Sequence, residues 1–360
     1  MTPSISMRSN PTMVDSYLPF GSPATSTLCT IAMALGPNSN AREYSIKVAL
    51  DTGARETWVF ADNFRKLDDD WNETDWSEEE QSTQTFKMHR TSWNTVSSLR
   101  SANLPEARLE FADRSKIKTC VIHETLKFIA GRYGSRGTPI SIDRCPLSIV
   151  LAANRRAVNT RFSGMLGLAP ENSTSSYKVN HETFLERLVS KDVISKPCFY
   201  MRVLPPDIYT KELADDSEGV TSFICFGEWP CSKTPRFVEI PVKTWRSWTI
   251  KLMSITLSYP KAGTAKDYEE VEVEVGGNVL LDCGAFASIF KNECRNTLYA
   301  RQGARWVTFA FANDIAGLIH KVVCDAKTFL YYRDRNDDEE EVVLGTASSN
   351  KMILGLVRVM

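Results

Sequence analysis

Short apolar runs separated by polar turns fill most of the chain, and this pattern predicts a mainly β protein. Leu28–Leu35 is largely apolar, and after a turn at 36–40 the segment Tyr44–Leu50 alternates apolar and polar side chains. Together these two segments predict a β-hairpin. Further strand patterns lie at 117–122, 147–151, 223–227, 248–252, 270–275 and 306–311.

Few segments have helical spacing. In His181–Leu188 the apolar side chains of Phe184, Leu185 and Leu188 share one helical face, and Asn180 is the expected N-cap. The acidic stretch 68–80 predicts a solvated surface loop. Strands therefore dominate the predicted architecture.

Local composition divides the chain into three parts. Residues 1–27 are polar and rich in Pro, Ser and Thr, which predicts a disordered N-terminal segment. A proline-flanked stretch at 230–241 predicts a crossing between two lobes, the first at 28–235 and the second at 236–360.

Overall composition excludes several classes of partner. The 360 residues are 42% hydrophobic, enough for a large core, and 43 basic against 44 acidic side chains give a net charge of −1. This balance argues against nucleic acid as a partner, and no apolar run is long enough for a membrane span. Residues 1–27 lack the pattern of a signal peptide. The nine cysteines include no CxxC pair, and their odd number leaves at least one thiol free.

Two distant segments share one chemical pattern. Val48–Ala54 and Val279–Ala285 each consist of an apolar strand followed by Asp-x-Gly-Ala. Glycine permits a tight turn after the aspartate, so each segment places a carboxylate at the end of a strand. The repeat predicts that Asp51 and Asp282 meet across a pseudo-twofold axis and share one proton, which supplies one acid and one base.

Each Asp turn is followed later by an apolar–apolar–Gly segment, Gly164–Ala169 in the first half and Met352–Leu356 in the second. With these segments, and with Trp58 shortly after the first turn, the chain resembles the pepsin-like aspartic peptidases, especially the nepenthesin-like and other plant or fungal members. The resemblance implies a mainly β, bilobal acid-protease fold with pseudo-twofold related lobes and an interlobe cleft. Each Asp turn would then lie beside one of the two Gly segments.

The resemblance also implies an activity and a site. The expected reaction is hydrolysis of peptide bonds in an extended peptide or protein substrate, at acid pH, by a monomer without metal or cofactor. Such enzymes are usually secreted or vacuolar, although no signal peptide is visible here. The implied residues are the catalytic pair Asp51 and Asp282, the turn residues Thr52, Gly53, Ala54, Cys283, Gly284 and Ala285, the flap residues Phe111 and Asp113, and the supporting Trp58, Gly167 and Gly355.

Three departures from the family pattern motivate an alternative. Cys283 stands where a Ser or Thr is usual, and a thiol is a weaker donor, which predicts a looser brace between the turns. Phe111 aligns with a flap Tyr and lacks its hydroxyl, unless it is an ordinary core residue of a strand. The chain also ends soon after Gly355, where the family continues through another strand. The alternative is a weak or inactive relative that binds proteins, as in the plant xylanase-inhibitor branch.

Other hydrolytic chemistries lack their motifs. His123–Glu124 and His181–Glu182 begin like a zinc-peptidase HExxH motif, but neither has the second histidine. No GxSxG elbow, P-loop or dinucleotide-binding fingerprint is present. The paired aspartates are therefore the candidate chemistry.

Overall fold

The computed structural model describes most of the chain in segments. These are residues 12–13, 30–37, 46–83, 86, 96–111, 114–130, 138–158, 162–170, 182–202, 223–227, 242, 247–262, 267–284, 303–313, 317–325, 342–344 and 353–357.

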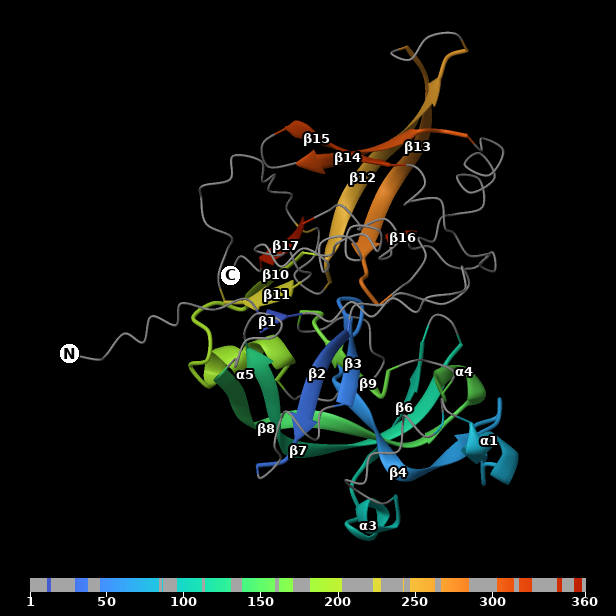
Figure 1. Cartoon of the computed structure of the whole chain (residues 1–360), viewed down its shortest axis with the longest axis vertical. Helices are drawn as coiled ribbons and strands as arrows, with labels where there is room; N and C mark the ends of the chain where they lie inside the picture. Colours follow the sequence, from blue (N-terminus) through green and yellow to red (C-terminus); the bar gives the residue numbers. More distant parts are fainter. Residues whose placement is uncertain are drawn as a thin grey trace, which may run out of the picture.

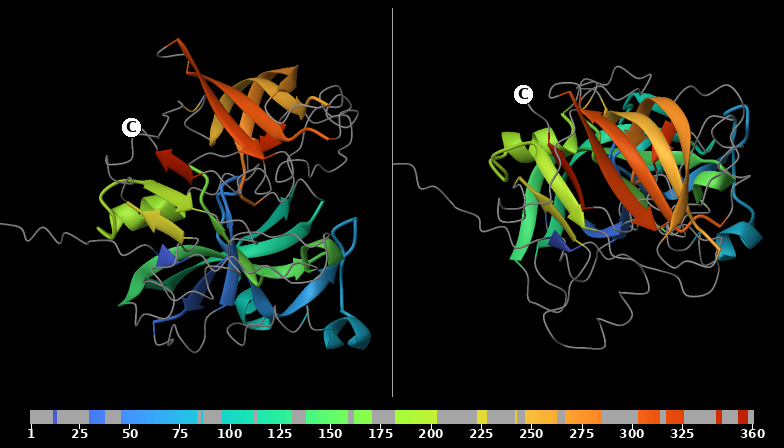
Figure 2. Two further views of the ribbon diagram at one scale, coloured as in Figure 1. Left: turned by 45° about the horizontal axis from the view of Figure 1, so that its top comes forward. Right: turned by 90° about the horizontal axis from the view of Figure 1, so that it is seen from above.

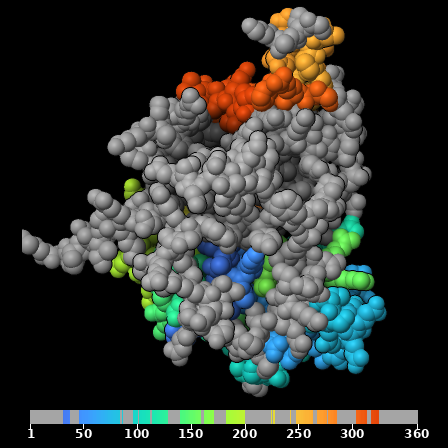
Figure 3. All heavy atoms as spheres, viewed as in Figure 1, coloured from blue at the N-terminus to red at the C-terminus, as the bar shows by residue number. Residues whose placement is uncertain are grey.

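Within these residues the strands form two sheets, of 12 and 5 strands, which occupy opposite ends of the molecule (Figures 1 and 2). The space-filling view shows the same division (Figure 3). The larger sheet contains β1 (Thr12–Met13), β2 (Thr30–Leu35), β3 (Ile46–Asp51), β4 (Trp58–Leu67), β5 (Glu73–Thr74), β6 (Glu106–Glu110), β7 (Lys116–Ala130), β8 (Thr138–Ala153), β9 (Gly164–Gly167), β10 (Cys198–Arg202), β11 (Phe223–Phe226) and β17 (Ile353–Val357). The smaller contains β12 (Thr249–Pro260), β13 (Tyr268–Leu281), β14 (Trp306–Asn313), β15 (Leu318–Asp325) and β16 (Val342–Leu344).

Short helices flank the larger sheet (Figure 1). They are α1 (Glu78–Ser82), α3 (Val96–Ser101), α4 (Arg155–Val158) and α5 (Phe184–Ser190). No helix in the described ranges combines the length and the apolar character that a bilayer span requires. The mainly β prediction is therefore confirmed.

The predicted hairpin is also confirmed. β2 and β3 are antiparallel, with Thr30 opposite Ala49 and Met33 opposite Ile46. Val48, Ala49 and Leu50 are all fully buried, because neighbouring strands and the core cover both faces of β3. The other predicted strand segments lie in β7, β8, β11, β12, β13 and β14.

Two local predictions need correction. Thr12–Met13, part of the segment 1–27 that was expected to be disordered, form a short strand that pairs with β11 and β7. The helix α5 is capped by Thr183 rather than Asn180: the Thr183 side chain accepts from the Glu186 N–H, and the Glu186 carboxylate accepts from the Thr183 N–H. This reciprocal box satisfies two N–H groups, one more than the Thr183 side chain alone would satisfy.

The acidic stretch is more ordered than predicted. It contains β5 and α1, and α1 begins with a capping box between Ser77 and Glu80. Trp76 is buried against Phe64 and Phe86. The predicted crossing at 230–241 lies outside the described residues.

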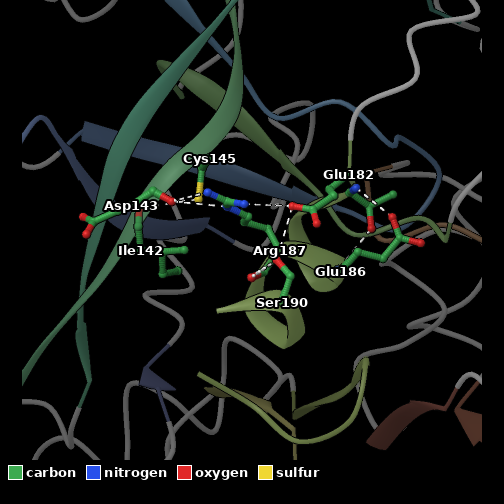
Figure 4. A network of polar contacts seen from close by, with 8 residues as sticks. Ile142, Asp143, Cys145, Glu182, Glu186, Arg187 and Ser190 are labelled. Atoms are coloured by element: carbon green, nitrogen blue, oxygen red, sulfur yellow. Dashed lines mark hydrogen bonds and ion pairs between the residues drawn. The ribbon is translucent and has the colours of Figure 1, made fainter. Parts of the chain in front are cut away.

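An arginine attaches α5 to the sheet (Figure 4). Arg187 donates to the Asp143 carbonyl from Nε at 3.2 Å and Nη2 at 2.8 Å, and its Nη1 donates to Glu182 at 3.1 Å. Burial raises the pKa of the neighbouring Cys145 thiol to about 12, so this sulfur is protonated. Cys145 is one of four buried cysteines within the described residues; the others are Cys120, Cys198 and Cys283.

A hairpin between β6 and the start of β7 is anchored by an ion network. Glu73 of β5 accepts from Arg100 of α3 at 2.5 Å and from Lys118 of β7 at 2.9 Å, and Arg100 also contacts Glu106 of β6. Burial opposes ionisation of Glu73, but the bonds from Arg100 and Lys118 outweigh it and lower the pKa of the carboxyl. The network joins both strands of this hairpin to the rest of the lobe.

Replacing Glu73 with Gln should lower the free energy of unfolding by about 0.5–1.5 kcal/mol near neutral pH, because two charge-assisted bonds are weakened in a partly solvated site. A lowered folded-state pKa means that this stability is present above the ordinary pKa of Glu and is lost as pH falls through the folded value. Urea unfolding measures the free energy of unfolding of Glu73→Gln. The control is Glu79→Gln, which changes an exposed glutamate of α1. A difference between the variants that persists undiminished in acid would contradict the assignment.

Candidate active site

The first aspartate ends a strand in the middle of the larger sheet. β3 lies between β2 and β9, and β9 runs parallel to it with Asp51 opposite Gly167. On its other side β9 pairs with β4, so this short strand passes between the two strands that flank the Asp turn. A side chain at Gly167 would overlap the Arg55 carbonyl, so only glycine permits this close approach. Gly167 therefore lies beside the first turn, as expected.

The second aspartate has an equivalent neighbour, but not the predicted one. β13 ends at Leu281, directly before Asp282, and its parallel partner is β16, with Leu281 opposite Leu344. Gly355 lies instead in β17, opposite Tyr200 of β10. The prediction that the Gly355 segment supports the second turn is thus wrong. Val343-Leu344-Gly345 has the same apolar–apolar–Gly pattern as the later segment, and a local pattern cannot decide which copy pairs with β13.

Hydrogen bonds cross between the two turns. The Thr52 hydroxyl donates to the Leu281 carbonyl at 2.7 Å and accepts from the Cys283 N–H at 2.9 Å. In return, the Cys283 thiol donates to the Leu50 carbonyl at 3.2 Å. Thr52 and Cys283 are both buried. The thiol thus makes the same kind of crossing bond as the hydroxyl, through a larger and weaker donor.

Main-chain N–H groups hold each carboxylate within its own turn. Asp51 Oδ1 accepts from the Gly53 N–H at 2.7 Å and from the Ala54 N–H at 2.9 Å. Asp282 Oδ1 accepts from the Gly284 N–H at 2.7 Å. Ala285 lies outside the described residues. These bonds fix one oxygen of each carboxyl group.

The glycines bring the two carboxyl groups face to face. A Cβ atom on Gly53 would lie 2.8 Å from the Asp282 carboxyl carbon, and one on Gly284 would overlap the Asp51 carboxyl. Each turn therefore packs its glycine against the aspartate of the other turn. The carboxyl groups of Asp51 and Asp282 are therefore close enough to interact directly. The sequence prediction that both aspartates share one site agrees with this geometry.

The pair is electrostatically uneven. Asp51 is buried, at 6% exposure, whereas Asp282 is partly exposed. Burial first, then the charge of Asp282 and the hydrogen bond to it, raise the pKa of Asp51 well above its usual value. The N–H groups of Gly53 and Ala54 act in the opposite direction and are outweighed. The raised pKa of Asp51 is that of a carboxyl pair that shares one proton.

Aromatic side chains line the region next to the first turn. Trp58 is buried, and its ring centre lies 6.2 Å from that of Phe111 and 6.4 Å from that of Phe162. Phe111 follows β6 at the turn of the hairpin, so it is not an interior residue of a strand. Asp113 lies outside the described residues.

Trp248 also contacts the first Asp segment, which the sequence did not indicate. Its indole Nε1 donates to the Leu168 carbonyl at 2.9 Å, and the Leu168 N–H donates to the Asp51 carbonyl at 2.7 Å. The Trp248 ring meets Phe199 edge-on at 5.8 Å. A tryptophan before an apolar strand has no signature that separates this role from core packing. Across the described part of the chain, His, Cys, Asp and Glu side chains nowhere gather in threes as a metal site.

Gly284→Ala should lower the free energy of unfolding by about 1–3 kcal/mol, because the added methyl group overlaps the buried Asp51 carboxyl. Gly277→Ala is the matched control in the strand that leads to the same turn, since its Cβ would meet only the Val275 carbonyl, at 3.6 Å. The control should change stability by about 0.5 kcal/mol or less. Thermal and urea unfolding measure both, and equal losses would contradict the close contact of the turns.

Asp51→Asn should stabilise the protein near neutral pH. Since the folded-state pKa is raised, native stability is fully present below the ordinary pKa of Asp and is lost as pH rises through the folded value. The amide has no charge to bury, so its advantage should vanish near pH 3, about one unit below that ordinary value. Urea unfolding at both pH values, with exposed Asp70→Asn as the control, tests this. A stability advantage of the amide variant that is independent of pH would contradict the raised pKa.

Comparison with known proteins agrees with this geometry. The chain matches the family model described as eukaryotic aspartyl protease over residues 35–309, which is more than half of its length and includes both Asp51 and Asp282. Comparison with curated protein sequences gives no match. Two β-sheet lobes with crossed Asp turns are the pepsin-like bilobal fold. The chain therefore belongs to the eukaryotic aspartyl protease family.

Proposed function

We propose that this chain is an aspartic endopeptidase that hydrolyses peptide bonds with Asp51 and Asp282. The observation that carries the proposal is the pair of carboxyl groups that the crossed turns bring face to face. Family membership supports peptidase activity in general. The crossed bonds between the turns support it further, because they hold the two carboxyl groups rigidly without using the oxygens that would react.

The reaction divides acid and base roles between the two aspartates. Asp282, as the carboxylate, removes a proton from a water molecule whose oxygen attacks the peptide carbonyl carbon. Asp51 donates its proton to the carbonyl oxygen, which gives a neutral tetrahedral diol. Asp282 then passes the acquired proton to the nitrogen, the C–N bond breaks, and one diol hydroxyl returns its proton to Asp51. The aspartic-protease pair is the standard example of this shared proton.

The unequal burial of the pair supports this division of roles. A carboxyl group that is buried and has a raised pKa retains its proton at a pH where an ordinary aspartate has lost it. The more exposed Asp282 can then carry the negative charge. Activity should be highest in acid and should fall as pH rises through the raised pKa, when Asp51 loses the proton that it must donate.

The substrate that suits this fold is an extended peptide. Main-chain groups at strand ends can pair with an extended segment, as in other β-type recognition. The hairpin that carries Phe111 is the proposed flap over such a peptide. Its contact with Trp58, seven residues beyond Asp51, is the observation that supports this role.

Two of the departures that suggested an inactive binding protein have structural counterparts that favour the enzyme. Cys283 keeps a crossing bond to the Leu50 carbonyl. The chain also provides two apolar–apolar–Gly segments, so β17 can join the larger sheet while β16 pairs with β13. Phe111 still lacks a hydroxyl group.

Denatured casein or haemoglobin should be cleaved by the purified chain in acid, and pepstatin should block the cleavage. Asp282→Asn and Asp51→Asn should each reduce the rate by at least about a thousandfold, since each removes one half of the acid–base pair. The measurement is the appearance of new amino termini across acidic to neutral pH.

The matched control is Asp70→Asn, which changes an exposed aspartate outside the site and should leave the rate unchanged. If the folded chain cleaved nothing at any pH, or cleaved equally well after Asp282→Asn, the proposal would be wrong. The first of these outcomes would lead to the protein-binding alternative.

A further inference from the structure

The hairpin turn that carries Phe111 is closed by its own main chain. The Phe111 N–H donates to the Ser115 carbonyl at 2.9 Å, and the Arg114 N–H donates to the Phe111 carbonyl at 2.8 Å. Arg114 adopts a left-handed conformation with φ of 66°, which is unusual for a residue other than glycine. Such a conformation persists where neighbouring groups fix it.

One side chain from outside the hairpin bonds to this turn. Asn154 follows β8, and its Nδ2 donates to the Arg114 carbonyl at 2.9 Å, while its Oδ1 accepts from the Lys116 N–H at 3.1 Å. The Asn154 N–H also donates to the Lys116 carbonyl at 3.0 Å. Asn154 therefore holds main-chain groups on both sides of Ser115.

The same amide begins α4. Asn154 Oδ1 accepts from the Ala157 N–H at 3.1 Å, as an N-cap does. The Lys116 and Ala157 N–H groups require the amide oxygen, and the Arg114 carbonyl requires the amide nitrogen. Only one orientation of the Asn154 amide satisfies all three partners. Asn154 is 7% exposed, so water cannot easily replace a lost partner, and each of these bonds contributes to stability.

Phe111 lies against the wall beside the first Asp turn through ring contact. Phe111 has no hydroxyl group, and among the described residues the buried Trp58 Nε1 finds no hydrogen-bond partner. The two rings are tilted, with an interplanar angle of 47°. In the part of the turn that the structure describes, Asn154 provides side-chain hydrogen bonds at its base.

We propose that Asn154 is a positioning residue that holds the Phe111 hairpin against Trp58 and so sets how tightly the site binds substrate. This inference rests on the proposed peptidase function for its kinetic part, whereas the placement of the hairpin can be measured without catalysis. The side-chain amide of Asn154 bonds to main-chain groups of Arg114, Lys116 and Ala157. It acts through the main chain of Arg114 and Lys116.

Asn154→Asp isolates the bond to the turn. The carboxylate can still accept from the Lys116 and Ala157 N–H groups, but it cannot donate to the Arg114 carbonyl, so the cap of α4 is kept while the turn is released. Hydrogen exchange should rise at least about tenfold at the amides of Phe111 and Arg114 near neutral pH, the effect of about one lost hydrogen bond. KM for a peptide substrate should rise about tenfold with a smaller change in kcat. Asn154→Ala should do both more strongly.

Thr183→Ala is the control for general destabilisation. It removes the cap of α5, which should cost about 1 kcal/mol of stability and leave both hairpin exchange and KM unchanged. Faster exchange confined to the hairpin in the Asn154 variants supports the proposal. Unchanged exchange at the hairpin amides, or a rise in exchange spread uniformly over the protein, overturns it. If the unmodified chain cleaved no peptide, the proposed function would fail, while the exchange data would still decide whether Asn154 holds the hairpin.

Discussion

The reciprocal bonding of the two Asp turns is the constraint on which the rest of the site depends. Thr52 and Cys283 each donate to the carbonyl of the strand that ends in the opposite turn, and each glycine packs against the opposite carboxyl group. These contacts leave little freedom in the separation of Asp51 and Asp282. Burial of Asp51 first, and then the nearby charge of Asp282, raise the pKa of Asp51, and both follow from the same geometry.

The two crossing bonds differ in strength, because one donor is the Thr52 hydroxyl and the other is the Cys283 thiol. Thr52 both donates and accepts across the turns, whereas the donor on the other side is a sulfur atom. Sulfur is larger and a weaker donor than oxygen, but its bond to the Leu50 carbonyl is buried, where an alternative bond to water is unavailable. The thiol bond is the weaker of the two, but both side chains donate across to the opposite strand in the same way.

Support for the site comes from both sheets. β9 and β16 each run parallel to a strand that leads into an Asp turn. Trp248, directly before β12 of the smaller sheet, donates to the Leu168 carbonyl, directly after β9 of the larger sheet. The hairpin that carries Phe111 is held in place by Glu73 of β5 and by Asn154, which follows β8. Both residues lie far from Phe111 in the sequence. The reacting groups are therefore few, and most of the chain serves to position them.

The mainly β class, the β2–β3 hairpin and the two Asp turns could be predicted from the sequence, because apolar alternation and Asp-x-Gly-Ala are local patterns with a direct physical cause. Which of two similar segments lies beside Asp282 depends on the packing of the whole chain. Val343-Leu344-Gly345 and Ile353-Leu354-Gly355 have the same pattern, and pairing depends on the strands that compete for each edge. The roles of Asn154 and Trp248 were equally hidden, since their partners are main-chain carbonyl and N–H groups that every residue carries.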